Sequence, residues 1–289
     1  MNTPLSERPH HTFEDRAHEL EQKAHERVER IQSALHSRPK WYREVMFVGV
    51  LYALYTLVRN INGSAISVDV ANRHALDVVH AEKWLHIFSE KGIQDFFLDH
   101  SRWFVHFMNI WYGTAHFIVT IGALLYMYFM FPRRYQKWRN VIFGTTFFAL
   151  VGYVIYPLAP PRLLPASYGF EDTLKTIGGW LNFNNNAVED VSNQYAAMPS
   201  LHVGWSVWCA LSLAPILRPW WAKVLICLYP CMTITTIVAT ANHYWMDVFG
   251  GLFVLSIGYL IGEVIERRRI RKLLEAGKIT EADLEATQA

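Results

Sequence analysis

Charged residues are scarce in this 289-residue chain. They make up 18% of the sequence, against about 25% in an ordinary soluble domain, and 52% of the residues are hydrophobic. The charges are crowded into residues 1–44, into short clusters and into residues 263–289. This distribution argues against a soluble single domain and indicates an integral membrane protein.

The net charge is also small, at +2, and gives no support to a nucleic-acid partner. The eleven Trp and fourteen Tyr residues are more typical of the aromatic belts at the two membrane–water interfaces than of base-stacking platforms. We therefore expect the chain to have the bilayer, and no nucleic acid, as a partner.

Cysteine is rare, and the number of cysteines is odd. Cys209, Cys227 and Cys231 all fall in apolar stretches, so we expect no disulfide framework. Cys227 and Cys231 are four residues apart, but no second Cys/His pair follows nearby to complete a zinc set. We expect all three to be buried small side chains and no metal site. The polar first 40 residues also lack the apolar core of a secretory signal peptide.

Apolar residues recur at spacings of three and four between Phe13 and Leu35. This pattern predicts an amphipathic helix that ends before Pro39. Three interpretations stay open: an arm for self-association as a coiled coil, an arm on the membrane surface, or a solvated extension with a weak apolar stripe.

The predicted fold class is all-α: a polytopic membrane protein with six transmembrane helices. A crossing needs about 20 apolar residues for about 30 Å of hydrocarbon. Such segments lie near 44–60, 103–130, 140–157, 200–217, 221–239 and 246–265. Segment 64–100 has a mixed periodicity and too many charges to span, which predicts interfacial helices. The predicted domains are a partly helical cytoplasmic extension (1–40), the six-span catalytic domain (41–266) and a cytoplasmic tail (267–289).

The Lys and Arg residues of the short loops predict the orientation. With six spans, all four basic clusters fall on one side of the membrane. They are Arg38, Lys40 and Arg43; Arg133, Arg134, Lys137 and Arg139; Arg218 and Lys223; and Arg267, Arg268, Arg269, Arg271 and Lys272. The chain is then a multi-pass protein of the cell membrane with both termini in the cytoplasm. Segments 64–100, 158–199 and 240–245 lie on the opposite face.

The long loop on that outer face ends where the fourth predicted span begins. The unpaired N–H groups and the dipole of a helix N-terminus favour a bound anion such as phosphate. Ser200 can cap this helix and donate to the anion, and His202 in its first turn points a titratable ring to the same place. Arg162, at the start of the loop, supplies a positive charge.

The sixth predicted span opens with Asn242-His243-Tyr244-Trp245-Met246-Asp247. A spacing of four on a helix places His243 and Asp247 on one face, where the carboxylate can accept the Nδ1–H and leave the Nε2 lone pair outward. An Asp in a membrane helix costs about 2.5–3.5 kcal/mol and is a functional-site hypothesis by default. The predicted catalytic residues are His202, His243 and Asp247. Candidate substrate contacts are Arg162, Ser200, Asn242 and Tyr244.

These residues resemble the type 2 phosphatidic acid phosphatase superfamily of membrane lipid phosphatases and phosphotransferases. The resemblance rests on Pro199-Ser200-Leu201-His202, followed about forty residues later by the His-x-x-x-Asp arrangement of His243 and Asp247, and covers roughly residues 100–265. Ala-Met-Pro-Ser-Leu-His-Val-Gly and Asn-His-Tyr-Trp-Met-Asp-Val-Phe-Gly-Gly look closest to the inositol phosphorylceramide synthase branch and its bacterial relatives.

The sequence departs from the usual family pattern at two of its three cations. Leu163 follows Arg162 where the family has Pro, Ile155 stands in place of the Lys, and Thr236-Ile237 stand in place of Ser-Arg. A doubly charged monoester needs more neutralisation than a singly charged diester, so the loss favours a diester substrate. The 158–199 loop carries several aromatic residues and suits a cover that excludes water, which favours transfer over hydrolysis.

The resemblance implies cofactor-free displacement at phosphorus through a phosphohistidine. His243 would attack, oriented by Asp247, and His202 would act as general acid and base. The partners would be a phospholipid donor and either water or a lipid hydroxyl as acceptor. A lipid phosphate phosphatase acting on phosphatidic acid or an isoprenoid phosphate is the alternative. Two alternatives are more distant: a non-catalytic lipid binder or transporter, and a haem or metal protein that uses His106, His116, His202 and His243.

Overall fold

The structure of the chain is a computed structural model, which describes residues 18, 22, 38–62, 65–179, 195–277, 279 and 280. Most of the predicted N-terminal helix therefore lies outside the described residues. Contacts divide the chain into two units: residues 39–266, called the membrane unit, and a second unit formed by 1–38 and 267–289. In the second unit, Ile279 packs against the end of the last helix.

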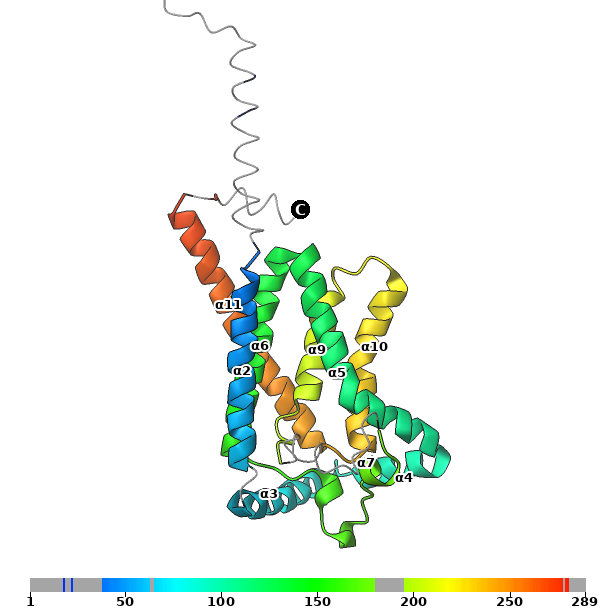
Figure 1. Ribbon diagram of the computed structural model, residues 1–289. Helices are drawn as coiled ribbons and strands as arrows, with labels where there is room; N and C mark the ends of the chain where they lie inside the picture. Colours follow the sequence, from blue (N-terminus) through cyan, green and yellow to red (C-terminus); the bar gives the residue numbers. More distant parts are fainter. Residues whose placement is uncertain are drawn as a thin grey trace, which may run out of the picture. The chain divides into compact units, whose positions relative to one another are not determined.

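The described residues of the membrane unit are helical and contain no strand, as predicted (Figure 1). Four helices are long and apolar enough to cross a membrane: α5 (Arg102–Met130), α6 (Pro132–Ile155), α10 (Trp220–Ala239) and α11 (Trp245–Glu275). The 22-residue α2 (Trp41–Asn62) and the shorter apolar α9 (Leu201–Leu213) occupy the other two predicted segments. The chain is thus an all-α polytopic membrane protein, and the count of six spans stays a prediction.

Two helix boundaries differ from the predicted ones by eight residues or more. The third predicted span starts at 140, but α6 begins at Pro132, because proline at the first helical position needs no hydrogen-bond partner for a backbone N–H. The last predicted span ends at 265, but α11 continues through the basic cluster to Glu275. The predicted start of the tail at residue 267 thus lies inside a continuous helix.

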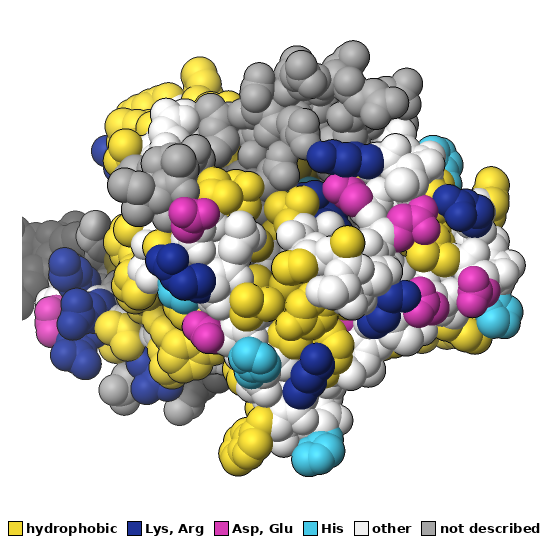
Figure 2. All heavy atoms as spheres, turned by 90° about the horizontal axis from the view of Figure 1, so that it is seen from below, with side chains coloured by type: hydrophobic (Ala, Val, Ile, Leu, Met, Phe, Trp, Pro, Cys, Tyr) yellow, Lys and Arg dark blue, Asp and Glu magenta, His cyan; other side chains and the backbone are white. Residues whose placement is uncertain are grey.

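The predicted interfacial segment forms two helices at one end of the membrane unit. These are α3 (Ala65–Trp84) and α4 (Glu90–His100), and the short η1 (Pro161–Leu163), η2 (Ala166–Tyr168) and α7 (Thr173–Thr176) lie at the same end. The α5–α6 and α9–α10 connections lie at the other end (Figure 1). Seen from the α3 end, the surface mixes acidic, basic and His side chains with apolar ones (Figure 2).

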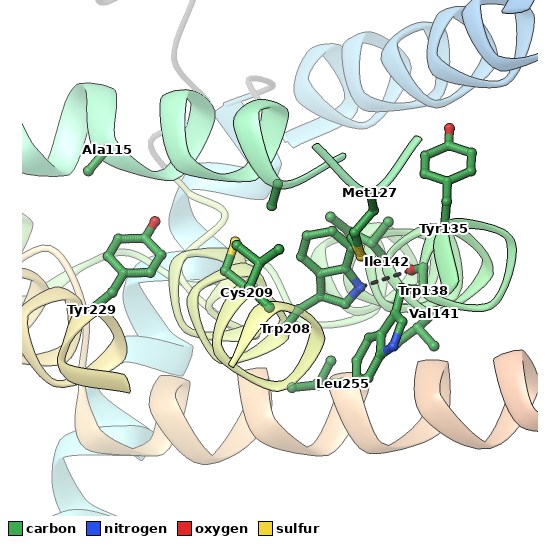
Figure 3. Packing of buried hydrophobic residues seen from close by; sticks show 12 residues of the cluster. Ala115, Met127, Tyr135, Trp138, Val141, Ile142, Trp208, Cys209, Tyr229 and Leu255 are labelled. Carbon is green, nitrogen blue, oxygen red and sulfur yellow. Dashed lines mark hydrogen bonds between the residues drawn. The ribbon is translucent and has the colours of Figure 1, made fainter. Parts of the chain in front are cut away.

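A buried aromatic core fixes α9 among its neighbours, which include α5, α6 and α10. Trp208 of α9 is fully buried, and its indole N–H donates to the carbonyl of Trp138 on α6 at 2.9 Å (Figure 3). Met127 of α5 and Leu255 of α11 belong to the same cluster. These contacts hold the body of α9, so the beginning of α9 has a defined position at the α3 end.

The expectation that all three cysteines are buried is wrong for two of them. Cys209 is buried in the aromatic core, whereas Cys227 and Cys231 are exposed on α10. Since α10 is long and apolar enough to cross a membrane, its exposed small side chains suit contact with lipid chains.

Candidate active site

His243 and Asp247 form a buried pair at the start of α11. His243 Nδ1 lies 3.1 Å from Asp247 Oδ2, and the two residues are 3% and 0% exposed. The same Oδ2 accepts the backbone N–H of Tyr244 at 2.9 Å. Because a carboxylate only accepts, Nδ1 carries the proton and the Nε2 lone pair is available.

The predicted position of His243 inside the helix is wrong, since α11 begins two residues later, at Trp245. His243 lies in the turn after α10, where its N–H and that of Asn242 both donate to the carbonyl of Ile237. The preceding Ala241 has a φ of 53°, in the left-handed region, which reverses the chain here. The turn, and not a helical face, brings the imidazole to Asp247.

Ser200 lies opposite the outer nitrogen of this histidine. Its Oγ is 3.4 Å from His243 Nε2, and its N–H donates to the carbonyl of Asp247 at 3.1 Å. Ser200 occupies the N-cap position of α9, but its side chain makes no capping bond, so that prediction is wrong. The hydroxyl is turned toward the histidine instead.

A glycine allows α11 to approach the start of α9 this closely. A Cβ on Gly251 would lie 2.4 Å from the Ser200 carbonyl oxygen and 3.2 Å from Cβ of Val203. Both of those atoms belong to packed segments with little freedom to move. Gly251 is therefore required for the register that places Ser200 beside His243.

His202 lies in the first turn of α9, with its ring centroid 5.4 Å from that of His243. Two residues of α5 lie against it, and the motif spacing did not place either of them in the site. Tyr112 stacks on His202 at 4.4 Å, and His116 lies 4.4 Å away edge to face. His116 Nδ1 in turn lies 3.0 Å from the Tyr112 carbonyl. Among the described residues, no hydrogen bond or ring contact joins His106 to this group.

Arg162 is joined to the site through Asn242. Its Nε donates to Asn242 Oδ1 at 2.9 Å, and its backbone N–H donates to the carbonyl of Ala241 at 2.9 Å. Its NH1 group also forms a 3.2 Å ion pair with Asp172, whose second oxygen, Oδ1, is buried without a partner in the described part of the chain. Asn242 thus positions the guanidinium, and Asp172 offsets part of its charge.

Asn109 of α5 anchors the segment that carries Asp172. Its side-chain amide donates to the carbonyls of Thr173 and Gly178, at 2.9 and 2.8 Å, and its oxygen accepts from the Thr173 hydroxyl. In the sequence, Asn109 is a polar residue within the apolar 103–130 segment, and that placement is the signal that points to it. The remainder of the long loop, 180–194, lies outside the described residues.

Tyr244 is fully buried in a cluster with residues of α3, including Ala71 and Ala75. Its hydroxyl has no hydrogen-bond partner among the described residues. Its role as a substrate contact stays a prediction, as do the roles assigned to the other site residues. Over the same described ranges, no group of three or more His, Cys, Asp and Glu side chains is arranged to hold a metal ion.

Searches of curated proteins and of solved structures give no match to this chain. A family model described as the PAP2 superfamily matches residues 76–261, more than half of the chain. The match includes α9, the His243 turn and most of α11, which are the segments that build the buried pair and its surroundings. The chain therefore belongs to the PAP2 superfamily.

Proposed function

We propose that the protein is a lipid phosphotransferase that works through a phosphohistidine on His243. Membership of the PAP2 superfamily supports a phosphatase- or phosphotransferase-type lipid enzyme of the membrane. The observation that carries the proposal is the buried pair, in which Asp247 occupies Nδ1 of His243 and Nε2 remains available. This is the arrangement of an activated and oriented nucleophile.

In the first step, His243 Nε2 attacks phosphorus and forms a P–N bond while the bond from phosphorus to the leaving oxygen breaks. His202 gives its proton to that oxygen. In the second step, His202 removes a proton from the acceptor hydroxyl, whose oxygen forms the new P–O bond as the P–N bond breaks. Asp247 stabilises the positive charge that develops on the His243 ring.

Arg162, Ser200 and the N–H groups at the start of α9 stabilise the negative charge on the phosphoryl oxygens. The ion pair with Asp172 leaves less positive charge for the substrate than a free arginine would. This supports a singly charged phosphodiester donor over a doubly charged monoester. The proposed reaction is transfer of a phospho-head group from a phosphodiester lipid to a lipid hydroxyl, as in inositol phosphorylceramide synthases.

The site is proposed to face away from the cytoplasm. The start of α9 and the turn between α10 and α11 lie at the α3 end of the membrane unit, and the α5–α6 and α9–α10 connections lie at the other end (Figure 1). The first two segments carry His202 and His243. Arg133 adjoins the α5–α6 connection, and Arg218 lies in the α9–α10 connection. The preference of basic loops for the cytoplasmic side supports this orientation.

The test is a product analysis of the purified protein with mixed phospholipids, with and without an added lipid alcohol, by mass spectrometry. We expect a new phospholipid that forms only when the alcohol is present, with loss of a diester donor. Efficient hydrolysis of phosphatidic acid or an isoprenoid phosphate, with every diester ignored, would overturn transfer in favour of a simple phosphatase. Release of no head group from any lipid would overturn the enzymatic proposal.

A further inference from the structure

Two glutamates from the interfacial helices bind the first backbone N–H groups of α11. Glu90 Oε1, on α4, accepts the N–H of Trp245 at 3.1 Å, and Glu82 Oε1, on α3, accepts the N–H of Met246 at 2.7 Å. The Trp245 indole N–H also donates to Ser89 Oγ at 2.9 Å. These bonds link segments more than 150 residues apart in the sequence.

The same turn carries the catalytic pair of the proposed function. The next N–H toward the N-terminus, that of Tyr244, donates to Asp247 Oδ2, which also accepts from His243. Three consecutive N–H groups at the beginning of α11 thus each donate to a carboxyl group. Two of these carboxyl groups, those of Glu82 and Glu90, belong to other helices, so they fix where this turn lies relative to the rest of the site.

Both glutamates are fully buried, at 0% exposure. The pKa of the Glu82 carboxyl is raised to about 9, first by burial and then by its interaction with Glu90. The N–H of Met246 lowers the pKa of Glu82, and Asp247 raises it. Burial, then Asp247 and then the charges of the two glutamates raise the pKa of the Tyr244 hydroxyl.

The free oxygen of Glu82 agrees with a protonated carboxyl. Its Oε2 is buried, and no N–H or O–H group of the described residues donates to it. An oxygen that carries its own proton needs no donor and can itself donate to a neighbouring carboxylate. Glu82 and Glu90 bind neighbouring N–H groups of one turn, so their buried carboxyls lie close together. A proton on one of them lets it donate to the other, whereas two carboxylates can only accept.

We propose that Glu82 and Glu90 share one proton and act as a pair of positioning residues, which hold the turn that carries His243 and Asp247. The inference rests on the proposed function, since the turn matters for turnover only if His243 is the nucleophile. Loss of the shared proton would place two negative charges close together in a buried site, and their repulsion would displace the carboxyls from the N–H groups of Trp245 and Met246.

The test uses two substitutions at Glu82 in the full-length protein. Glu82→Gln keeps the oxygen that accepts from Met246 and supplies an N–H toward Glu90, so it mimics the protonated glutamate permanently. We expect wild-type turnover at pH 7 from this variant. We also expect wild-type activity to decline as the pH rises through about 9, and this decline to be absent in Glu82→Gln.

Glu82→Ala removes the bond to Met246 and leaves Glu90 without its partner. We expect kcat to fall by about 10- to 100-fold with KM changed less than about twofold, because a displaced turn misplaces the nucleophile and not the lipid. Asp95→Asn is the matched control: Asp95 lies on α4, five residues after Glu90, and pairs with Lys91 on the surface. It should change neither kcat nor the pH profile.

Three results would overturn the pairing: an inactive Glu82→Gln at pH 7, a Glu82→Ala variant with wild-type kcat, or the same alkaline decline in wild type and Glu82→Gln. If Glu82→Ala fails to fold, which size-exclusion chromatography in detergent detects, the Glu82→Gln pH profile decides alone. Full activity of His243→Ala would instead overturn the proposed function, so the two failures are distinguishable.

Discussion

The ion pair between Arg162 and Asp172 makes the charge preference of the proposed enzyme testable by a single substitution. In the wild type, the Arg162 NH1 group lies 3.2 Å from Asp172 Oδ2. Asp172→Asn keeps a side-chain oxygen that can accept from this group but removes the negative charge. The geometry of the guanidinium is therefore retained while its effective charge increases. We expect the variant to accept doubly charged phosphate monoesters better, relative to diesters, than the wild type does.

The size of the effect follows from the ion-pair distance. A phosphorus atom about 4 Å from the guanidinium, on the side away from Asp172, would lie about 7 Å from that carboxylate. At an effective dielectric constant of about 20, unit charges at that separation repel by about 2.4 kcal/mol. The side chains are 10% and 15% exposed, so solvent and salt reduce this to about 1–2 kcal/mol.

Removing the carboxylate relieves this repulsion once for a diester and twice for a monoester. The ratio of kcat/KM for phosphatidic acid to kcat/KM for a diester donor should therefore rise by about 5- to 30-fold. The control is Glu171→Gln, which neutralises the neighbouring residue, whose partner is Arg102. An unchanged ratio in Asp172→Asn, or an equal rise in Glu171→Gln, would refute the assignment of Asp172 as the counter-ion that sets the preference.

Five further outcomes are expected. His243→Ala should abolish turnover while the protein remains membrane-inserted. Asp247→Asn should lower the rate less, because the amide fills the same space without the charge. Single-turnover assays measure both rates, and a wild-type rate in either variant would contradict the role of that residue. Gly251→Ala should lower kcat by about tenfold or more, because its Cβ would lie 2.4 Å from the Ser200 carbonyl oxygen; a fully active variant would show that this register does not matter. Turnover should survive EDTA, since the phosphohistidine route uses no metal; loss with EDTA and recovery with Mg²⁺ would contradict that route. A cysteine at exposed Asp99, in a variant without the three native cysteines, should react with an impermeant thiol reagent in intact cells. Labelling only after permeabilisation would show that the chain has the opposite orientation.

Local sequence patterns were sufficient to predict most of the helices and part of the site. Apolar runs predicted where the helices lie, because a lipid-facing helix must be apolar over its whole length. The spacing of His243 and Asp247 predicted their hydrogen bond, although a turn and not a helix produces it. What the pattern did not contain was the direction of a single side chain: Ser200 has the backbone of an N-cap, but its hydroxyl is turned toward His243.

The contacts that the sequence could not reveal are those between distant segments. Glu82 and Glu90 look like ordinary polar residues of interfacial helices, and only the packing of α3 and α4 against the start of α11 makes them fully buried. His116 resembles any interfacial histidine until α5 places it beside His202.

The two acidic features of the site act in different ways on the same chemistry. In the proposed mechanism, Asp172 offsets the charge of Arg162 and so influences which phosphate binds. The Glu82–Glu90 pair binds the backbone of the turn and so influences how well the nucleophile is placed. A change at Asp172 should therefore alter the ratio between substrates at constant pH, and a change at Glu82 should alter the pH profile for every substrate equally. Measuring both variants on both substrate classes separates selection of the phosphate from placement of the histidine.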